Sequence, residues 1–214
     1  MREQLTDLRS TRNPKARIKI MEGHFATVNS HINTYIDMST VKCRHNNGRE
    51  TARVLAEHFR NNTMVDTIVC LDGTEVIGTF MAEFLSDRGI MSINSGNNIS
   101  IITPDVNAYG QLVFMDSTIR MNKNMQVLVL AASVTTGRTI AQAAEAVSYY
   151  GGTVGGVAAI FSNVEQTPEE MEIFSIFHKE DLPDYQAYQP SECPMCRRKQ
   201  PLDAIVNSFG YSKL

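Results

Sequence analysis

The residues best suited to binding a ligand lie in VLVLAASVTTGRTIAQAAEAV, Val127 to Val147, where an apolar run meets a turn rich in Thr and Gly. A turn that opens a helix leaves backbone N–H groups unpaired, and the helix dipole adds roughly half a positive charge there. Threonine hydroxyls add donors, and glycine lets a ligand approach the backbone closely. We therefore expect a phosphate site at Ser133, Thr135, Thr136, Gly137, Arg138 and Thr139. The alternative is a helix start that binds nothing, with Arg138 solvated.

A second turn, Asp72-Gly73-Thr74, follows the apolar run Thr67 to Leu71 and precedes a stretch with helical spacing. Its backbone could face a diphosphate. Alternatively, Asp72 or Thr74 is an ordinary helix N-cap.

Cys193 and Cys196 have the Cys-x-x-Cys spacing of half a zinc site. A closed site needs two more ligands, which a partner subunit could supply. The other candidates in this chain form no second such pair: Cys43, His45, Cys70 and His178. The alternative is a pair of reduced thiols near a turn.

The remaining side chains that could bind a ligand or take part in catalysis form no recognisable sequence motif. Arg197-Arg198-Lys199 is a short basic cluster, which is more often a solvated surface than a ligand site. His24, His31 and His58 are isolated in the sequence, and we interpret them as surface or core residues. No Ser-His-Asp or Cys-His pattern is recognisable, so no catalytic residue is assigned.

The elements that must position these groups alternate along the chain. Short apolar runs predict strands, and segments with apolar residues at helical spacing separate them. This alternation predicts an α/β fold with a parallel sheet flanked by helices. The first 20 residues are predicted as a weakly amphipathic helix, and Asn107 to Met125 as a loop. The expected strands are Thr34–Met38, Thr67–Leu71, Ile99–Ile102, Val127–Ala131 and Val154–Phe161.

Composition limits the classes of function. The chain has 214 residues and a net charge of −3, which gives no general electrostatic reason for nucleic-acid or anionic-membrane binding. No apolar run approaches the roughly 20 residues of a membrane span, and the first residues lack the apolar region of a secretory signal. Four cysteines without such a signal favour a reducing cytoplasm.

Taken together, these motifs resemble the type I phosphoribosyltransferases, and orotate phosphoribosyltransferases most of all. In that family an apolar strand, two acidic residues and a Thr-Gly-x-Thr turn hold the ribose and its 5-phosphate. EGHFATVNSHINTYIDM resembles the N-terminal region of the orotate enzymes, and VDTIVCLDGTEVIGTFMAEFL resembles the diphosphate loop and its flanks. The resemblance covers Gly23 to Ser162, about two thirds of the chain.

The chain departs from the family pattern at three places. Ala131 and Ala132 stand where the acidic pair is expected, and Val28 stands where a lysine is expected. The stretch Ile102 to Met115 corresponds to the mobile catalytic loop but contains no basic residue. Losing two carboxylate acceptors for ribose hydroxyls would cost roughly 10²–10⁴ in affinity, at about 1.5–3 kcal/mol for each hydrogen bond to a charged group.

The resemblance implies a hood from residues 1–45, a phosphoribosyltransferase-like core over 46–165 and a C-terminal extension over 166–214, within one structural domain. It also implies a homodimer, with Mg²⁺ and phosphoribosyl diphosphate as ligands of an active enzyme. Two functions remain open: an orotate phosphoribosyltransferase-like enzyme acting on a pyrimidine-type base, and a degenerate nucleotide- or phosphosugar-binding regulatory protein. Zn²⁺ at Cys193 and Cys196 is a further expectation.

Overall fold

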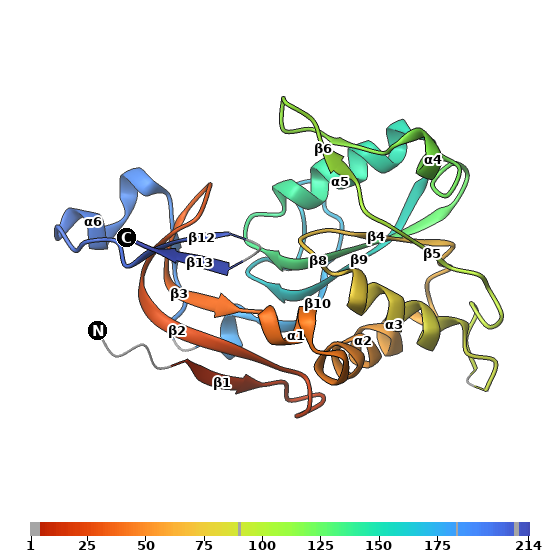
Figure 1. Cartoon of the computed structure of the whole chain (residues 1–214), viewed down its shortest axis with the longest axis horizontal. Coiled ribbons are helices and arrows are strands. Elements are labelled where there is room, and N and C mark those ends of the chain that lie inside the picture. The colour runs from red at the N-terminus through yellow and green to blue at the C-terminus, as the bar shows by residue number, and fades with distance from the viewer. Residues whose placement is uncertain (1–4, 90, 183, 208–209) are drawn as a thin grey trace.

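The computed structural model describes residues 5–89, 91–182, 184–207 and 210–214. Two main sheets lie side by side, with helices packed around one of them (Figure 1). The helices are α1 Ser39–Cys43, α2 His45–Phe59, α3 Glu75–Ser86, α4 Asp116–Ile119, α5 Arg138–Tyr149 and α6 Pro194–Arg197, with short 3-10 turns at Lys179–Asp181 and Pro190–Glu192.

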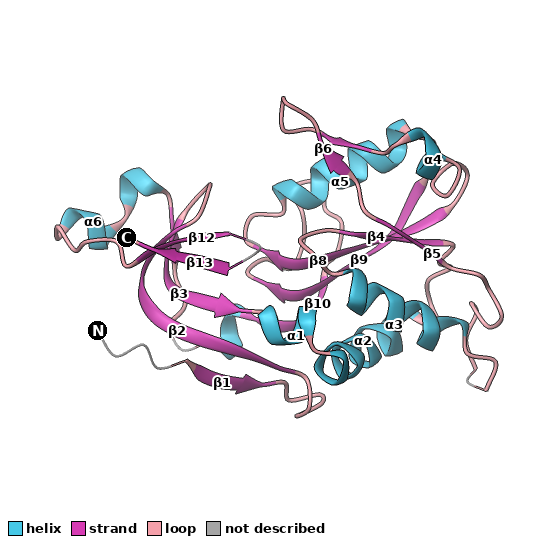
Figure 2. Ribbon diagram, viewed as in Figure 1, coloured by secondary structure: helices cyan, strands magenta, loops and turns pink. Residues whose placement is uncertain are grey.

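The core sheet has the order β10-β9-β8-β4-β5, and all its neighbouring strands are parallel. Its strands are β4 Thr67–Cys70, β5 Ser100–Ile102, β8 Gln126–Val134, β9 Thr153–Ser162 and β10 Phe174–His178. Helix α5 covers one face, and α2 and α3 cover the other (Figure 2). The continuous apolar runs predicted as strands are explained by this arrangement, because both faces of the sheet are buried.

The two faces of β8 lie in two separate hydrophobic clusters. Leu128, Leu130 and Ala132 belong to the cluster that contains α2, α3 and the hood, whereas Val129 and Ala131 belong to the cluster beneath α5. This alternation follows from the two-residue period of a strand. It sends the two alanines to opposite faces of the sheet.

The second sheet forms the hood over the core and has the order β11-β3-β2-β12-β13, with β1 also paired to β2. Its strands are β1 Thr6–Arg9, β2 Arg17–Ala26, β3 His31–Asp37, β11 Ala187–Tyr188, β12 Ala204–Asn207 and β13 Gly210–Lys213. The hood therefore combines the N-terminal residues with three strands of the C-terminal segment, while β10 of that segment extends the core sheet. The division at residues 45 and 165 stays a prediction.

The helix predicted for the first 20 residues is wrong over residues 5–20, and residues 1–4 lie outside the described part of the chain. Arg17–Ala26 is instead a ten-residue strand that pairs with β1 on one side and with β3 on the other. Ile18 is buried, while its neighbours Arg17 and Lys19 are partly exposed, which is the two-residue period of a half-buried strand. Pairing with distant segments decided the conformation here, and local helical spacing did not.

The segment Asn107 to Met125 was predicted as a loop and is partly regular. β6 Asp105–Val106 and β7 Leu112–Val113 form an antiparallel hairpin, and α4 follows. The hairpin projects from the core beside α5 (Figure 1), and Tyr109 near its tip is exposed. Among the described residues, no helix has the length and apolar character needed to cross a membrane.

Candidate functional site

A cavity of about 600 Å³ lies between the hood and the carboxyl-terminal ends of the core strands. This is the edge of an open parallel sheet where ligands usually bind, and the volume suits a small-molecule ligand. The hood contributes the turn between β2 and β3, the strand β3 and parts of β12 and β13. The core contributes Asp72, Phe161 and the whole stretch from Ala131 to Ile140.

The turn after β8 forms one wall of the cavity. All six residues predicted for the phosphate site line it, and most of their side chains are exposed: Ser133, Thr135, Thr136, Gly137, Arg138 and Thr139. Helix α5 begins at Arg138, and no side chain caps its N-terminus. The first N–H groups of a helix have no partner within it, so this end offers donors to an anion.

Gly137 sets the shape of this turn. Its φ is +79°, in the left-handed region, where a side chain costs free energy. A Cβ placed on it would also lie 3.1 Å from both Thr167 Cα and Pro168 Cδ. The position therefore favours glycine on two independent grounds.

The strand preceding the turn is longer than predicted. β8 continues to Val134, so Ala131 and Ala132 lie within the strand and not at its end. They line the cavity, yet only 2% and 3% of their surfaces are exposed. Their methyl groups provide no hydrogen-bonding atom to a ligand.

A carboxylate from another segment lies beside these alanines. Asp72 lines the cavity, and its carboxylate accepts a hydrogen bond from the Ala132 N–H. Lys42 Nζ donates to the Asp72 backbone carbonyl at 3.0 Å. Burial raises the pKa of Asp72, while Lys42 and the Ala132 hydrogen bond act in the opposite direction.

The other two residues of that turn lie differently. Gly73 and Thr74 do not line the cavity, although Gly73 continues the left-handed turn that Asp72 begins, with φ values of +58° and +76°. Thr74 is buried, and its hydroxyl donates to the carbonyls of Leu71 at 2.8 Å and Leu130 at 3.1 Å. It occupies the N-cap position of α3 without a side-chain capping bond. Its hydroxyl is therefore used inside the protein.

Sequence reasoning missed several residues of the cavity. Lys42 on α1 and Asp37 at the end of β3 both line it, as do Tyr35 and Tyr185. Burial is the main cause that raises the pKa of each tyrosine to about 12, so both phenols stay protonated near neutral pH. A lone lysine or tyrosine carries no spacing signal, so the sequence alone did not indicate these residues.

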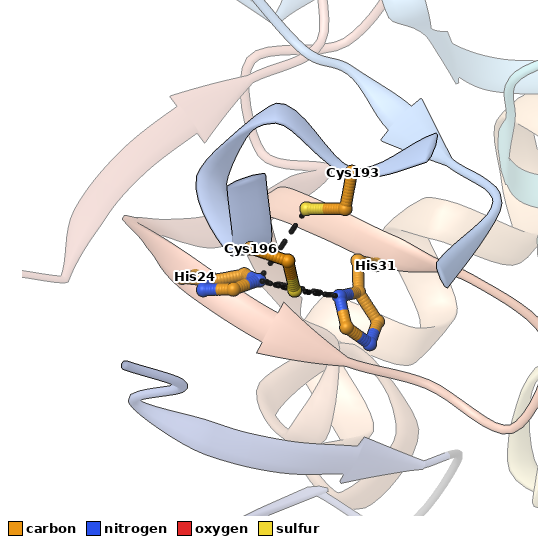
Figure 3. Close-up of side chains that lie close together, drawn as sticks. All are labelled: His24, His31, Cys193 and Cys196. Atoms are coloured by element: carbon orange, nitrogen blue, oxygen red, sulfur yellow. Dashed lines mark hydrogen bonds between the residues drawn. The ribbon is translucent and has the colours of Figure 1, made fainter. Parts of the chain in front are cut away.

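The histidines require a correction. His24 and His31 are not isolated, because the fold brings both to Cys193 and Cys196 (Figure 3). The four ligand atoms lie within 4.8 Å of one another. The other candidate ligands considered from the sequence are not part of this cluster among the described residues: Cys43, His45, Cys70 and His178.

His58 matches the prediction of a structural residue, since it stacks on Phe174 with 3.8 Å between ring centroids. The cluster Arg197-Arg198-Lys199 is exposed, follows directly on the cysteines and does not line the cavity of its own chain.

Comparisons with known proteins agree with the geometry. No family model matches the chain. It is 25% identical over 190 residues to an orotate phosphoribosyltransferase of Chlorobaculum parvum, and 28% identical over 188 residues to one of Chlorobium phaeobacteroides. Each alignment covers 86% of this chain and 88% of the relative.

Solved structures share the fold. The orotate phosphoribosyltransferase of Mycobacterium tuberculosis has a TM-score of 0.53 at 19% identity, over 77% of this chain and 92% of that one. The same enzyme in complex with 5-phospho-α-D-ribosyl 1-diphosphate has a TM-score of 0.51, over 70% and 83% of the two chains. An adenine phosphoribosyltransferase of Leishmania donovani also reaches 0.51, at 12% identity over 76% and 78%. The chain is therefore similar in sequence to orotate phosphoribosyltransferases along most of its length, and it shares the fold of the type I phosphoribosyltransferases.

Proposed function

We propose that this protein binds the 5-phosphate of a phosphoribosyl compound over Thr135–Thr139 and transfers the phosphoribosyl group to a pyrimidine-type base, as an orotate phosphoribosyltransferase-like enzyme of nucleotide metabolism. One observation carries the proposal: the uncapped N-terminus of α5 lies in the wall of a 600 Å³ cavity. The related M. tuberculosis enzyme is known in complex with phosphoribosyl diphosphate.

The distribution of side chains in the cavity supports a ligand with a charged end and a planar end. Threonine hydroxyls and helix N–H groups gather at the α5 side. On the hood side, Tyr35 and Tyr211 contact each other edge to face, with 5.2 Å between their ring centroids. Phe161, at the end of β9 in the core sheet, contacts Tyr185 in the same way at 5.3 Å. Aromatic faces suit a nucleobase, and the N-terminus of a helix suits a phosphate.

The family implies Mg²⁺ with phosphoribosyl diphosphate, and the cavity offers it two carboxylates, Asp37 and Asp72. One or two carboxylates with the ligand's own phosphate oxygens are the usual protein environment of Mg²⁺, so the residues present fit. When bound, Mg²⁺ supplies charge neutralisation to the diphosphate.

In the proposed reaction a ring nitrogen of the base forms a bond to the anomeric carbon as the bond from that carbon to the diphosphate oxygen breaks. The diphosphate leaves with the electron pair of that bond, and the proton of the ring nitrogen passes to solvent. This chain would hold the 5-phosphate at the α5 turn and place Lys42 and Arg138 in the same cavity. Fixed positive charges that face a departing anion lower the barrier for its departure. In this proposal Lys42 supplies positive charge that the 102–115 segment lacks.

A second candidate function, a binding or regulatory protein without turnover, is favoured by a specific observation. Ala131 and Ala132 provide no acceptor for ribose hydroxyls, and the hairpin of residues 102–115 has no basic side chain. In this candidate the cavity holds a nucleotide or phosphosugar, and the Asp72 carboxylate, which is hydrogen-bonded to the Ala132 N–H, would be an acceptor for ribose hydroxyls.

One assay separates the two functions. The full chain is incubated with Mg²⁺, phosphoribosyl diphosphate and a panel of orotate, uracil and adenine, and diphosphate release is measured beside calorimetric binding of each ligand. Release with a pyrimidine base supports the enzyme, and release with adenine alone contradicts the pyrimidine assignment. Binding without release supports the regulatory protein, and absence of phosphate or nucleotide binding refutes both.

The same proposal includes a cytoplasmic homodimer. The dimer would bring the exposed basic cluster Arg197–Lys199 of one chain within reach of its partner.

A further inference from the structure

A cluster of metal-binding side chains lies on the hood, separate from the residues that line the cavity. His24 lies in β2 and His31 begins β3, while Cys193 is the N-cap residue of α6 and Cys196 lies within that helix. The histidines and cysteines are more than 160 residues apart in the sequence, yet all four side chains converge on one point (Figure 3). We infer that they form a closed Cys₂His₂ site for a zinc-type metal ion that fastens the C-terminal segment to the hood.

The distances fit tetrahedral coordination. Zinc bonds of about 2.0–2.1 Å to nitrogen and about 2.3 Å to sulfur require separations of roughly 3.3 Å between two nitrogens and roughly 3.6 Å between nitrogen and sulfur. His24 Nε2 lies 3.2 Å from His31 Nδ1. It lies 3.5 Å from Cys193 Sγ and 3.6 Å from Cys196 Sγ, and His31 Nδ1 lies 3.3 Å from Cys196 Sγ. These four contacts match four of the six edges of a tetrahedron around one ion, and all four ligand atoms lie within 4.8 Å of one another.

Hydrogen bonding at His24 supports the same assignment. Its Nδ1 lies 3.0 Å from the Gln200 carbonyl and 3.2 Å from the Pro201 carbonyl, so this nitrogen carries the proton. His24 Nε2 then has a single lone pair. It faces His31 Nδ1 and the sulfur atoms of Cys193 and Cys196, and these three groups cannot all donate a hydrogen bond to it. A cation at the centre satisfies all four ligand atoms. A ligand histidine that donates its other N–H to a carbonyl is the usual second shell of a zinc site.

The ligand set selects the class of metal. Two thiolates and two imidazoles favour zinc over Mg²⁺, which prefers oxygen ligands, so this site differs from any cation that accompanies a phosphate in the cavity. His24 and Cys193 are fully buried. Four protein ligands with buried members are typical of structural sites, since catalytic sites keep a position open.

A redox-active cysteine pair explains fewer of the observations. A reactive Cys-x-x-Cys dithiol needs accessible sulfur; Cys196 is exposed, but Cys193, the first cysteine of the pair, is 0% exposed. A disulfide between the cysteines would also leave no reason for two imidazole nitrogens at 3.2 Å from each other.

The proposed Cys₂His₂ site holds together elements that border the cavity. His24 and His31 flank the turn Thr27–Ser30, which lines it. Beyond the cysteines, Asp203 pairs with the His24 backbone in both directions, at 2.8 Å each, and leads into β12. The metal would thus hold the hood wall in place without contacting the ligand.

The test measures metal content in the full chain, purified without chelator and without a metal-affinity column. We expect about one zinc per chain, as in other closed structural sites, and its loss in Cys196→Ser and in His31→Gln. Cys43→Ser is the matched control, because Cys43 is an exposed cysteine outside the cluster, and it should keep its zinc. Circular dichroism verifies that each variant is folded.

A second measurement guards against poor folding of the variants. The wild-type protein reconstituted with Co²⁺ should show thiolate-to-cobalt charge transfer and tetrahedral d–d absorption, both of which Zn²⁺ should abolish. A wild-type chain that takes up neither metal with its thiols reduced would overturn the inference, as would a Cys193–Cys196 disulfide found by mass spectrometry in fresh protein. Both readouts are taken without phosphoribosyl diphosphate, so they do not depend on the proposed enzymatic function.

Discussion

Replacing the two exposed threonines of the α5 turn, Thr136→Val with Thr139→Val, should weaken phosphate binding. Valine has nearly the shape of threonine and a similar helix propensity, so the change removes two hydroxyl donors and little else. The backbone N–H groups and the helix dipole stay in place, because Gly137 still holds the turn and no side chain caps it.

The size of the effect follows from the site. A hydrogen bond to a charged group contributes about 1.5–3 kcal/mol, and both side chains are exposed, so water competes for them. We therefore expect a combined loss of about 1.5–3 kcal/mol, which is roughly a 10- to 100-fold rise in the dissociation constant at 1.4 kcal/mol for each factor of ten.

Isothermal titration with inorganic phosphate, uridine monophosphate and uridine tests this reasoning. Binding of phosphate and of the nucleotide should weaken by the same factor, while binding of the nucleoside should not change. Ser148→Ala, at an exposed position in the last turn of the same helix, is the control for effects on α5 itself. An unchanged dissociation constant for phosphate in a folded double variant would refute the phosphate site.

Three further predictions concern the same cavity and the assembly. Ala131→Glu with Ala132→Asp should raise the affinity for phosphoribosyl diphosphate about tenfold in Mg²⁺, as one restored charged hydrogen bond would; no gain by calorimetry in a folded variant would show that the alanines are not the limiting defect. Asp72→Asn should make the protein more stable at neutral pH. Because burial raises the folded pKa of Asp72, the folded state binds its proton more tightly than the unfolded state, so wild-type stability falls as pH rises through that raised pKa. The stabilisation seen in urea unfolding should vanish below the ordinary pKa of aspartate, and an advantage that does not change with pH would contradict this cause. Light scattering should give twice the chain mass of 23.9 kDa, and a value equal to one chain would reject the dimer.

The core sheet was predictable because its signals are local. The apolar run of β8, the Thr-Gly turn and the helical spacing of α5 lie within about 20 consecutive residues, and each favours the observed structure independently. The same holds for β4 and α3. Burial of both sheet faces makes the strands uniformly apolar, which is a strong pattern in a single sequence.

The hood was not predictable from such signals. β2 gains its conformation from pairing with β1 and β3 on its two sides and with β12 from the far end of the chain. Lys42 reaches the Asp72 carbonyl across 30 residues, and His24 reaches Cys193 across 169. These contacts depend on the finished fold, and no spacing in the sequence encodes them.

The two ends of the cavity depend on different parts of the fold, and this separates their responses to metal loss. The proposed phosphate end is built by β8 and α5, within the hydrophobic cluster beneath α5. The aromatic end includes Tyr35 and Tyr211, which β3 and β13 hold in contact, and both strands belong to the sheet that the Cys₂His₂ cluster fastens. In Cys196→Ser, phosphate affinity should therefore match that of Cys43→Ser, while nucleotide affinity falls at least several-fold, because the base loses its ordered wall. Equal losses for phosphate and nucleotide would show that the metal supports the whole fold and does not act on the hood alone.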